Sequence, residues 1–174
     1  MDISPASAPR SAAILLHPHP DFGGNRFHPF IAGLYDRLPA VGVTAVRFDF
    51  SSSDPVAARD QAADAVTSAG APVILIGYSF GAGVAASVND DRVIGWYLLA
   101  PQTPSLAQAP IASDPRPKAI VVPEFDQYSP PAAVETAVAG WQATTVTTAS
   151  GVDHFLGAVG PIVDEAVEWV VSLI

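Results

Sequence analysis

The chain has 174 residues, of which 49% are hydrophobic and 14% are charged. This composition predicts a compact α/β protein with a single core and argues against disorder. The net charge of −9 argues against a nucleic-acid or anionic-membrane partner, because either would call for a basic patch. The absence of cysteine excludes a disulfide, a thiolate nucleophile and a Cys-ligated zinc.

The start of the chain gives no sign of a targeting segment. Residues 1–9 have no basic n-region, and the first apolar run, residues 12–16, is too short for a signal peptide or a membrane span. We expect residues 1–10 to be a loose lead-in to a single domain that covers residues 1–174. We also expect a cytoplasmic protein with no membrane partner.

A buried strand is predicted over residues 11–16, and the loop after it has the sequence HPHPDFGGN (residues 17–25). This loop is either an ordinary connection or an oxyanion loop, which must point a backbone N–H at developing negative charge. Proline has no N–H, so His19 and residues 21–24 are the possible donors. We favour the oxyanion loop.

Helices and strands alternate through the rest of the chain. Helices are predicted over residues 29–40, from an Asp54 N-cap to about residue 69, over 80–88, over 129–140 and from 161 onward. Strands are predicted over residues 43–50, 72–76, 92–99, 118–122 and 143–148. Residues 101–117 form a proline-rich surface connection. This order predicts a mostly parallel sheet with right-handed crossovers.

The segment between the strand 72–76 and the helix 80–88 is Gly77-Tyr-Ser79-Phe-Gly81. Strand, G-x-S-x-G and helix together are typical of a nucleophile elbow, a strained turn that holds a serine hydroxyl clear of the sheet edge. The two glycines are needed because neighbouring backbone crowds the turn. The alternative is a glycine-rich connection with a buried serine.

A serine hydroxyl becomes a good nucleophile when a base takes its proton and a carboxylate holds that base in the right tautomer. In α/β-hydrolases the chain order is serine, acid, histidine. Of the four histidines, His154 alone follows Ser79, so it is the predicted base.

The acid must lie between Ser79 and His154. Glu124 and Asp126 are the two candidates, because both follow the predicted strand 118–122. We favour Asp126, since the Ser-Pro helix start after it suits a short loop that presents the carboxylate. The other acids in this range are less suitably placed in the predicted fold: Asp90, Asp91, Asp114, Glu135 and Asp153.

The motifs HPHP-x-FGG (17–24), GYSFG (77–81), EFD (124–126) and GVDHFLG (151–157) together resemble small α/β-hydrolases of the dienelactone-hydrolase-like group. The resemblance extends from about Ala12 onward. It implies a minimal α/β-hydrolase fold without a cap domain. It also implies that Ser79 is the nucleophile, Asp126 the acid and His154 the base. The backbone N–H groups of His19 and Phe80 would then form the oxyanion hole.

Three features depart from that group. Dienelactone hydrolases proper have cysteine where Ser79 stands, so their reaction is not implied. Residues 47–53 read RFDFSSS where relatives resemble R-F-N-F-R-G with a longer glycine-rich loop. We expect residues 1–11 to leave no room for the first two strands of the group. We therefore expect about six strands in the order 2-1-3-4-5-6, which sets the 17–24 loop beside the elbow.

The sequence predicts a serine hydrolase that cleaves small acyl esters or thioesters through an acyl-enzyme, without a cofactor or metal. Its expected partner is a small ester-type substrate in a cleft near Phe22, Tyr78, Phe125 and Phe155. One alternative is a hydrolase-fold binding or regulatory protein with an idle triad, which the short serine-rich loop 51–53 favours. A more distant one is a metal-dependent hydrolase that uses His17, His19 and Asp21.

Overall fold

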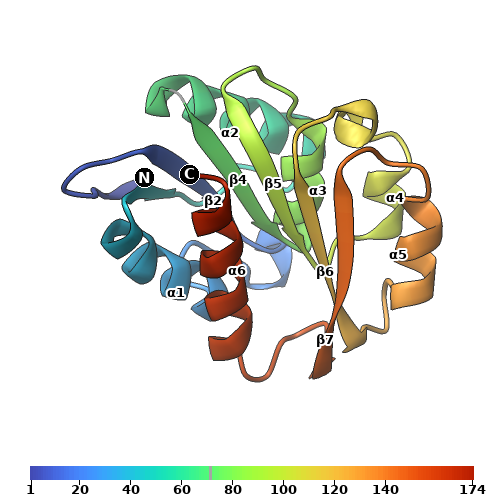
Figure 1. Cartoon of the computed structure of the whole chain (residues 1–174). Coiled ribbons are helices and arrows are strands. Elements are labelled where there is room, and N and C mark those ends of the chain that lie inside the picture. Colours follow the sequence, from blue (N-terminus) through green and yellow to red (C-terminus); the bar gives the residue numbers. More distant parts are fainter. Residues whose placement is uncertain (71) are drawn as a thin grey trace.

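The computed structural model describes residues 1–70 and 72–174, and its centre is a seven-stranded sheet in the order β1-β3-β2-β4-β5-β6-β7 (Figure 1). Strands β2 to β7 run parallel, and β1 pairs antiparallel with β3. The strands are β1 Asp2–Ser4, β2 Ser11–Leu16, β3 Val43–Arg47, β4 Val73–Tyr78, β5 Val93–Leu99, β6 Lys118–Phe125 and β7 Thr144–Asp153.

Helices cover both faces of this sheet (Figure 1). One core cluster joins the sheet to α2 (Pro55–Ala69), α3 (Phe80–Ser87) and α5 (Pro131–Ala137). The other joins it to α1 (Pro29–Arg37) and α6 (Gly160–Ser172). Shorter helical turns are η1 Pro20–Phe22, η2 Leu38–Val41, α4 Thr103–Leu106 and η3 Pro110–Ser113. The expected α/β class, a mostly parallel sheet covered on both faces, is confirmed.

The predicted order of six strands is also confirmed, because β3-β2-β4-β5-β6-β7 is the order 2-1-3-4-5-6 counted without β1. All six residues of β2 and all six of β4 are buried, as expected for strands covered on both faces. Since β2 and β4 are neighbours, the loop after β2 lies beside the turn after β4.

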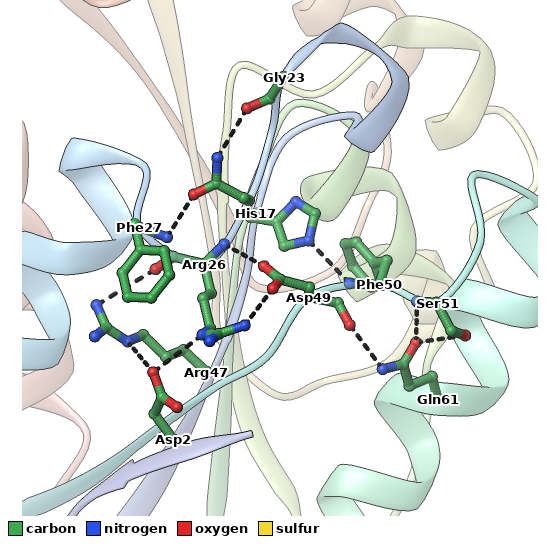
Figure 2. Close-up of polar contacts among 11 residues, drawn as sticks. Asp2, His17, Gly23, Arg26, Phe27, Arg47, Asp49, Phe50, Ser51 and Gln61 are labelled. Atoms are coloured by element: carbon green, nitrogen blue, oxygen red, sulfur yellow. Dashed lines mark hydrogen bonds and ion pairs between the residues drawn. The ribbon is translucent and has the colours of Figure 1, made fainter.

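The sheet has one strand more than the sequence predicted, and this strand lies in residues 1–10, which we expected to be a loose lead-in. β1 is three residues long and has no apolar run that would mark it. It is held by long-range contacts: its ladder to β3, and the Asp2 carboxylate, which accepts from Arg26 at 3.1 Å and from Arg47 at 3.3 Å (Figure 2). Local sequence patterns do not reveal contacts between residues this far apart in the chain, so β1 could not be predicted.

Several predicted boundaries shift. We had predicted that Glu124 follows the strand. β6 instead continues to Phe125, so Glu124 lies inside it. The reason is that β7 also extends, to Asp153, and pairs with β6 across an irregularity between Pro123 and Phe125. β3 ends at Arg47 and not at residue 50, and the first helix ends at Arg37 before a 3-10 turn.

Residues 101–117 contain only the short turns α4 and η3, which pack near α3 and α5. The connection is therefore no cap domain, as the resemblance implied. In the described part of the chain, no helix combines the length and the apolarity needed to cross a membrane.

Candidate active site

Ser79 lies in the tight turn between β4 and α3 with a positive φ of 54° and a ψ of −113°, a backbone conformation that residues with a side chain rarely adopt. A Cβ on Gly77 would come within 2.2 Å of the Gly81 carbonyl oxygen, and one on Gly81 within 2.1 Å of the Leu16 carbonyl oxygen. The Ser79 N–H donates to the Leu99 carbonyl at 2.9 Å, which ties the turn to β5. The turn therefore has the crowding and the strain of a nucleophile elbow.

A chain of short contacts links Ser79 to a carboxylate. The Ser79 hydroxyl lies 2.9 Å from Nε2 of His154, and Nδ1 of His154 lies 2.7 Å from Oδ2 of Asp126. All three residues are buried. With Nδ1 donating to the carboxylate, Nε2 is free to accept the serine proton.

The second oxygen of Asp126 is also held in place. Oδ1 accepts the N–H groups of Tyr128 and Ser129, both at 2.9 Å. Burial alone would raise the pKa of Asp126, but the hydrogen bonds from His154, Ser129 and Tyr128 hold this pKa below its ordinary value. The carboxylate is therefore ionised at neutral pH and fixed in orientation.

Glu124, the other candidate acid, does not contact His154. Its carboxylate accepts the N–H of Gly151 at 2.8 Å and so bridges β6 to the outer part of β7. Of the two acids that the sequence left open, the structure places Asp126 at the histidine.

Tyr78 holds the backbone of His154. Its hydroxyl donates to the His154 carbonyl at 2.5 Å. Burial, and then the charges of Asp126 and Asp153, raise the pKa of Tyr78, so this hydroxyl keeps its proton and remains a donor. The rings of Tyr128 and Phe155 flank the imidazole, with centroids 4.8 Å and 5.8 Å from it.

The structure narrows the set of oxyanion donors. The N–H groups of residues 21–24 are all engaged within the loop, on acceptors of His19 and Pro20. In residues 1–70 and 72–174, no hydrogen-bond acceptor is found for the N–H of His19 or of Phe80. The Phe80 N–H also lies at the N-terminus of α3, where the helix dipole favours negative charge.

A cleft of about 310 Å³ opens over Ser79 and His154. Of the predicted cleft residues it is lined by Phe22, Tyr78 and Phe155; Phe125, which is 61% exposed at the end of β6, lies outside it. This corrects the prediction for Phe125, which assumed that the strand ended before this residue. The other lining residues are Pro18, His19, Gly23, Gly24, His28, Gln102 and Tyr128.

Three of the lining residues were missed from the sequence. Tyr128 and Gln102 follow strand ends, a signal that also marked Asp126, but neither is a type that suggests chemistry. His28 is the N-cap of α1, and burial, followed by the nearby His17, lowers its pKa to about 4. At neutral pH it is therefore an uncharged wall of the cleft.

The residues of the metal-dependent alternative do not form a ligand set. Both ring nitrogens of His17 are engaged, Nδ1 with the Pro18 carbonyl at 2.6 Å and Nε2 with the Phe50 N–H at 2.9 Å. Nδ1 of His19 accepts the N–H of Asp21 at 3.3 Å. Across the described residues, no three His, Cys, Asp or Glu side chains are grouped so that they could hold a metal ion.

Solved structures with a similar fold cover nearly the whole chain. A candidate α/β hydrolase of unknown function from Agrobacterium tumefaciens is 25% identical, with a TM-score of 0.78 over 97% of this chain and 88% of that one. An α/β serine hydrolase homologue from Coxiella burnetii is 23% identical, with a TM-score of 0.80 over 98% of this chain and 88% of that one.

A third structure, an α/β serine hydrolase without a lid from Xanthomonas campestris, is 19% identical, with a TM-score of 0.73 over 98% of this chain and 86% of that one. No protein-family model matches the chain, and a search of the curated proteins finds no relative.

The packing of the elbow predicts the effect of Gly81→Ala. The added methyl group meets the Leu16 backbone, so the elbow must open, and we expect a loss of more than about 3 kcal/mol in unfolding free energy. Gly160→Ala is the matched control, because its Cβ meets no atom within 4 Å, and it should change stability by less than about 1 kcal/mol. Urea unfolding measures both, and equal stability of the two variants would contradict the crowding.

The contacts of the two acids predict a large loss of kcat in Asp126→Asn and a small one in Glu124→Gln. An amide at residue 126 leaves the imidazole in the wrong tautomer, so kcat should fall about 10³–10⁴-fold. Glu124→Gln keeps an acceptor for Gly151 and should cost less than about threefold. Steady-state turnover of a p-nitrophenyl ester compares them. A larger loss in Glu124→Gln would identify Glu124 as the acid.

Proposed function

We propose that this chain, a small lidless α/β-hydrolase in its fold, is a serine hydrolase that cleaves small acyl esters or thioesters through an acyl-enzyme. The observation that carries the proposal is the contact chain from Ser79 through His154 to Asp126, together with the N–H groups of His19 and Phe80, for which no acceptor is found in the described residues. These are the parts that acyl transfer requires: nucleophile, base, orienting acid and oxyanion donors.

The first half of the reaction forms the acyl-enzyme. The Ser79 proton passes to Nε2 of His154 while Oγ bonds to the substrate carbonyl carbon, and the carbonyl π electrons move to oxygen. The resulting oxyanion accepts the N–H groups of His19 and Phe80. When the C=O bond re-forms, the bond to the leaving group breaks, and the alcohol or thiol takes the proton from His154.

The second half repeats these steps with water. His154 takes a proton from a water molecule, whose oxygen bonds to the acyl carbon, and the Ser79–acyl bond then breaks with return of the proton to Oγ. Asp126 stays ionised and stabilises the imidazolium in both halves. The products are the carboxylic acid, the alcohol or thiol, and the free enzyme.

Space is available on two sides of Ser79. Besides the cleft at His154, a second hollow of about 420 Å³ begins at Ser79 and runs along α2, α3 and α4, so groups on either side of a scissile bond can find space. Aromatic side chains at the rim are highly exposed, among them Phe22 at 88%, since no cap covers them.

The serine-rich loop that favoured an idle triad contributes no wall to the cleft at His154. Ser51 bonds Gln61 through its N–H and hydroxyl, and the Ser52 hydroxyl accepts the Asp54 N–H ahead of α2. We also propose that the protein acts in the cytoplasm and that it belongs with the dienelactone-hydrolase-like proteins that carry serine at the elbow. With a net charge of −9, it includes no nucleic-acid or membrane partner.

The nucleophile is tested by Ser79→Ala. A fluorophosphonate probe should label the unaltered chain and not this variant, and kcat should fall by about 10⁴-fold or more. Ser172→Ala is the control, since this exposed serine lies at the end of α6 and should keep both labelling and turnover. Undiminished labelling of Ser79→Ala would show that another residue reacts. No labelling and no turnover in the unaltered chain would favour the idle triad.

The open cleft predicts the acyl-chain profile. Each buried methylene is worth ~0.8 kcal/mol, so a wall that ends early stops rewarding longer chains. We expect kcat/KM to be highest at about two to six acyl carbons and flat or falling beyond. A series of p-nitrophenyl esters measures this, and no jump in rate should occur above the micelle concentration. A profile that climbs steadily to long chains would contradict the lidless reading of residues 101–117.

A further inference from the structure

His17 takes no part in the proposed chemistry, yet it is buried and makes hydrogen bonds through both ring nitrogens. Nε2 lies 2.9 Å from the backbone nitrogen of Phe50, a contact that crosses from the end of β2 to the segment after β3 (Figure 2). Nδ1 lies 2.6 Å from the carbonyl oxygen of Pro18. The ring also packs on the Phe50 ring, with centroids 4.6 Å apart.

These two partners assign the tautomer of His17. The Phe50 N–H can only donate and the Pro18 carbonyl can only accept, so Nε2 carries the lone pair and Nδ1 carries the proton. Burial lowers the pKa of His17 despite opposing contributions from Pro18 and Asp49, so the ring stays neutral with this single arrangement.

The Pro18 carbonyl that His17 holds belongs to the same peptide group as the His19 N–H. A trans peptide group is planar, with its C=O and N–H pointing in opposite directions. A hydrogen bond that fixes the direction of this C=O therefore also fixes the direction of the N–H. The hydrogen bond from Nδ1 of His17 to the Pro18 carbonyl therefore orients the His19 N–H through one planar peptide group.

Other contacts hold the same peptide group and its loop. Gly24 folds back over the Pro18 carbonyl so closely that a Cβ there would lie 2.1 Å from its oxygen. At the far end of the loop, Oδ1 of Asp49 accepts the Arg26 N–H at 2.8 Å, and Oδ2 contacts the Arg26 guanidinium. Phe50 and Asp49 thus bind the two ends of the loop, at His17 and at Arg26 (Figure 2).

The segment that contains Asp49 and Phe50 is in turn hydrogen-bonded to α2. The Gln61 amide donates to the Asp49 carbonyl at 3.0 Å and accepts the Ser51 N–H at 2.9 Å (Figure 2). This gives a role to residues 47–53, whose sequence RFDFSSS departs from the resembled group. The segment connects α2 to the oxyanion loop and lines no part of the cleft at His154.

We propose that His17 is a positioning residue for the oxyanion hole: its Nδ1–H, held by the Phe50 N–H on Nε2, orients the Pro18–His19 peptide so that the His19 N–H faces the oxyanion above Ser79. This deepens the proposed function and rests on it. His17 touches no reacting atom, so its removal should impair transition-state stabilisation more than substrate binding.

Two matched variants separate the two bonds of the ring. In His17→Asn, the amide nitrogen lies at the same bond separation from Cβ as Nδ1 and can still donate to Pro18. In His17→Gln, the amide oxygen lies at the bond separation of Nε2 and can accept from Phe50, but the bond to Pro18 is lost. Each variant keeps one of the two bonds, so a structural role alone predicts similar effects on stability and activity.

The experiment compares the kcat for an oxygen ester with the kcat for its thionoester, in which sulfur replaces the carbonyl oxygen. Sulfur is a weak hydrogen-bond acceptor, so the thionoester reaction gains little from the two N–H donors. For His17→Gln we expect the ester kcat to fall about 10- to 100-fold with KM within about threefold, because one oxyanion donor is worth about 10²–10³ in kcat. The ester-to-thionoester ratio should therefore also fall about 10- to 100-fold, whereas His17→Asn should keep this ratio within about threefold.

The outcomes separate this inference from the proposed function. No turnover by the unaltered chain overturns the proposed function, and the inference with it. Turnover with equal losses in both variants and an unchanged ratio overturns the inference alone and leaves His17 a structural residue. If His17→Gln does not fold, the ¹⁵N spectrum of the unaltered imidazole decides: a proton on Nδ1 supports the orienting bond, and a proton on Nε2 overturns it.

Discussion

The site depends on one close approach of backbone, that of Gly81 at the start of α3 to the Leu16 carbonyl at the end of β2. Because no side chain separates them, the loop after β2 and the turn after β4 come together at one edge of the sheet. One contributes the His19 N–H, and the other contributes Ser79 and the Phe80 N–H. A bulkier residue at 81 would separate the proposed nucleophile from half of the proposed oxyanion hole.

A second requirement is that Asp126 and His154 meet over that turn, and the long pair β6–β7 provides it. β6 and β7 extend beyond their predicted ends and pair as far as Phe125 with Asp153, so the two residues that follow them start as neighbours. The Asp126 carboxylate then bonds Nδ1 of His154. Backbone N–H groups of Tyr128 and Ser129 donate to its other oxygen and so help to stabilise the buried charge.

Much of the fold could be predicted from the sequence because its signals are local. Apolar runs, proline and glycine positions and the G-x-S-x-G turn give the class and the order of six strands. β1 has no such signal, since it depends on Asp2 reaching Arg26 and Arg47. The pairing of His17 with Phe50 was invisible for the same reason, because it joins positions 33 residues apart. The roles of the site residues are still predictions, although their geometry is now defined.

A crystal structure of the chain with a phosphonate ester bound covalently tests the central claim most directly, because the adduct imitates the tetrahedral intermediate. We predict phosphorus on Oγ of Ser79, one phosphonyl oxygen within hydrogen-bond distance of the N–H groups of both His19 and Phe80, and Nε2 of His154 beside the leaving-group position. An adduct on another residue, or a phosphonyl oxygen that points away from these two N–H groups, would contradict the claim that this site performs acyl transfer.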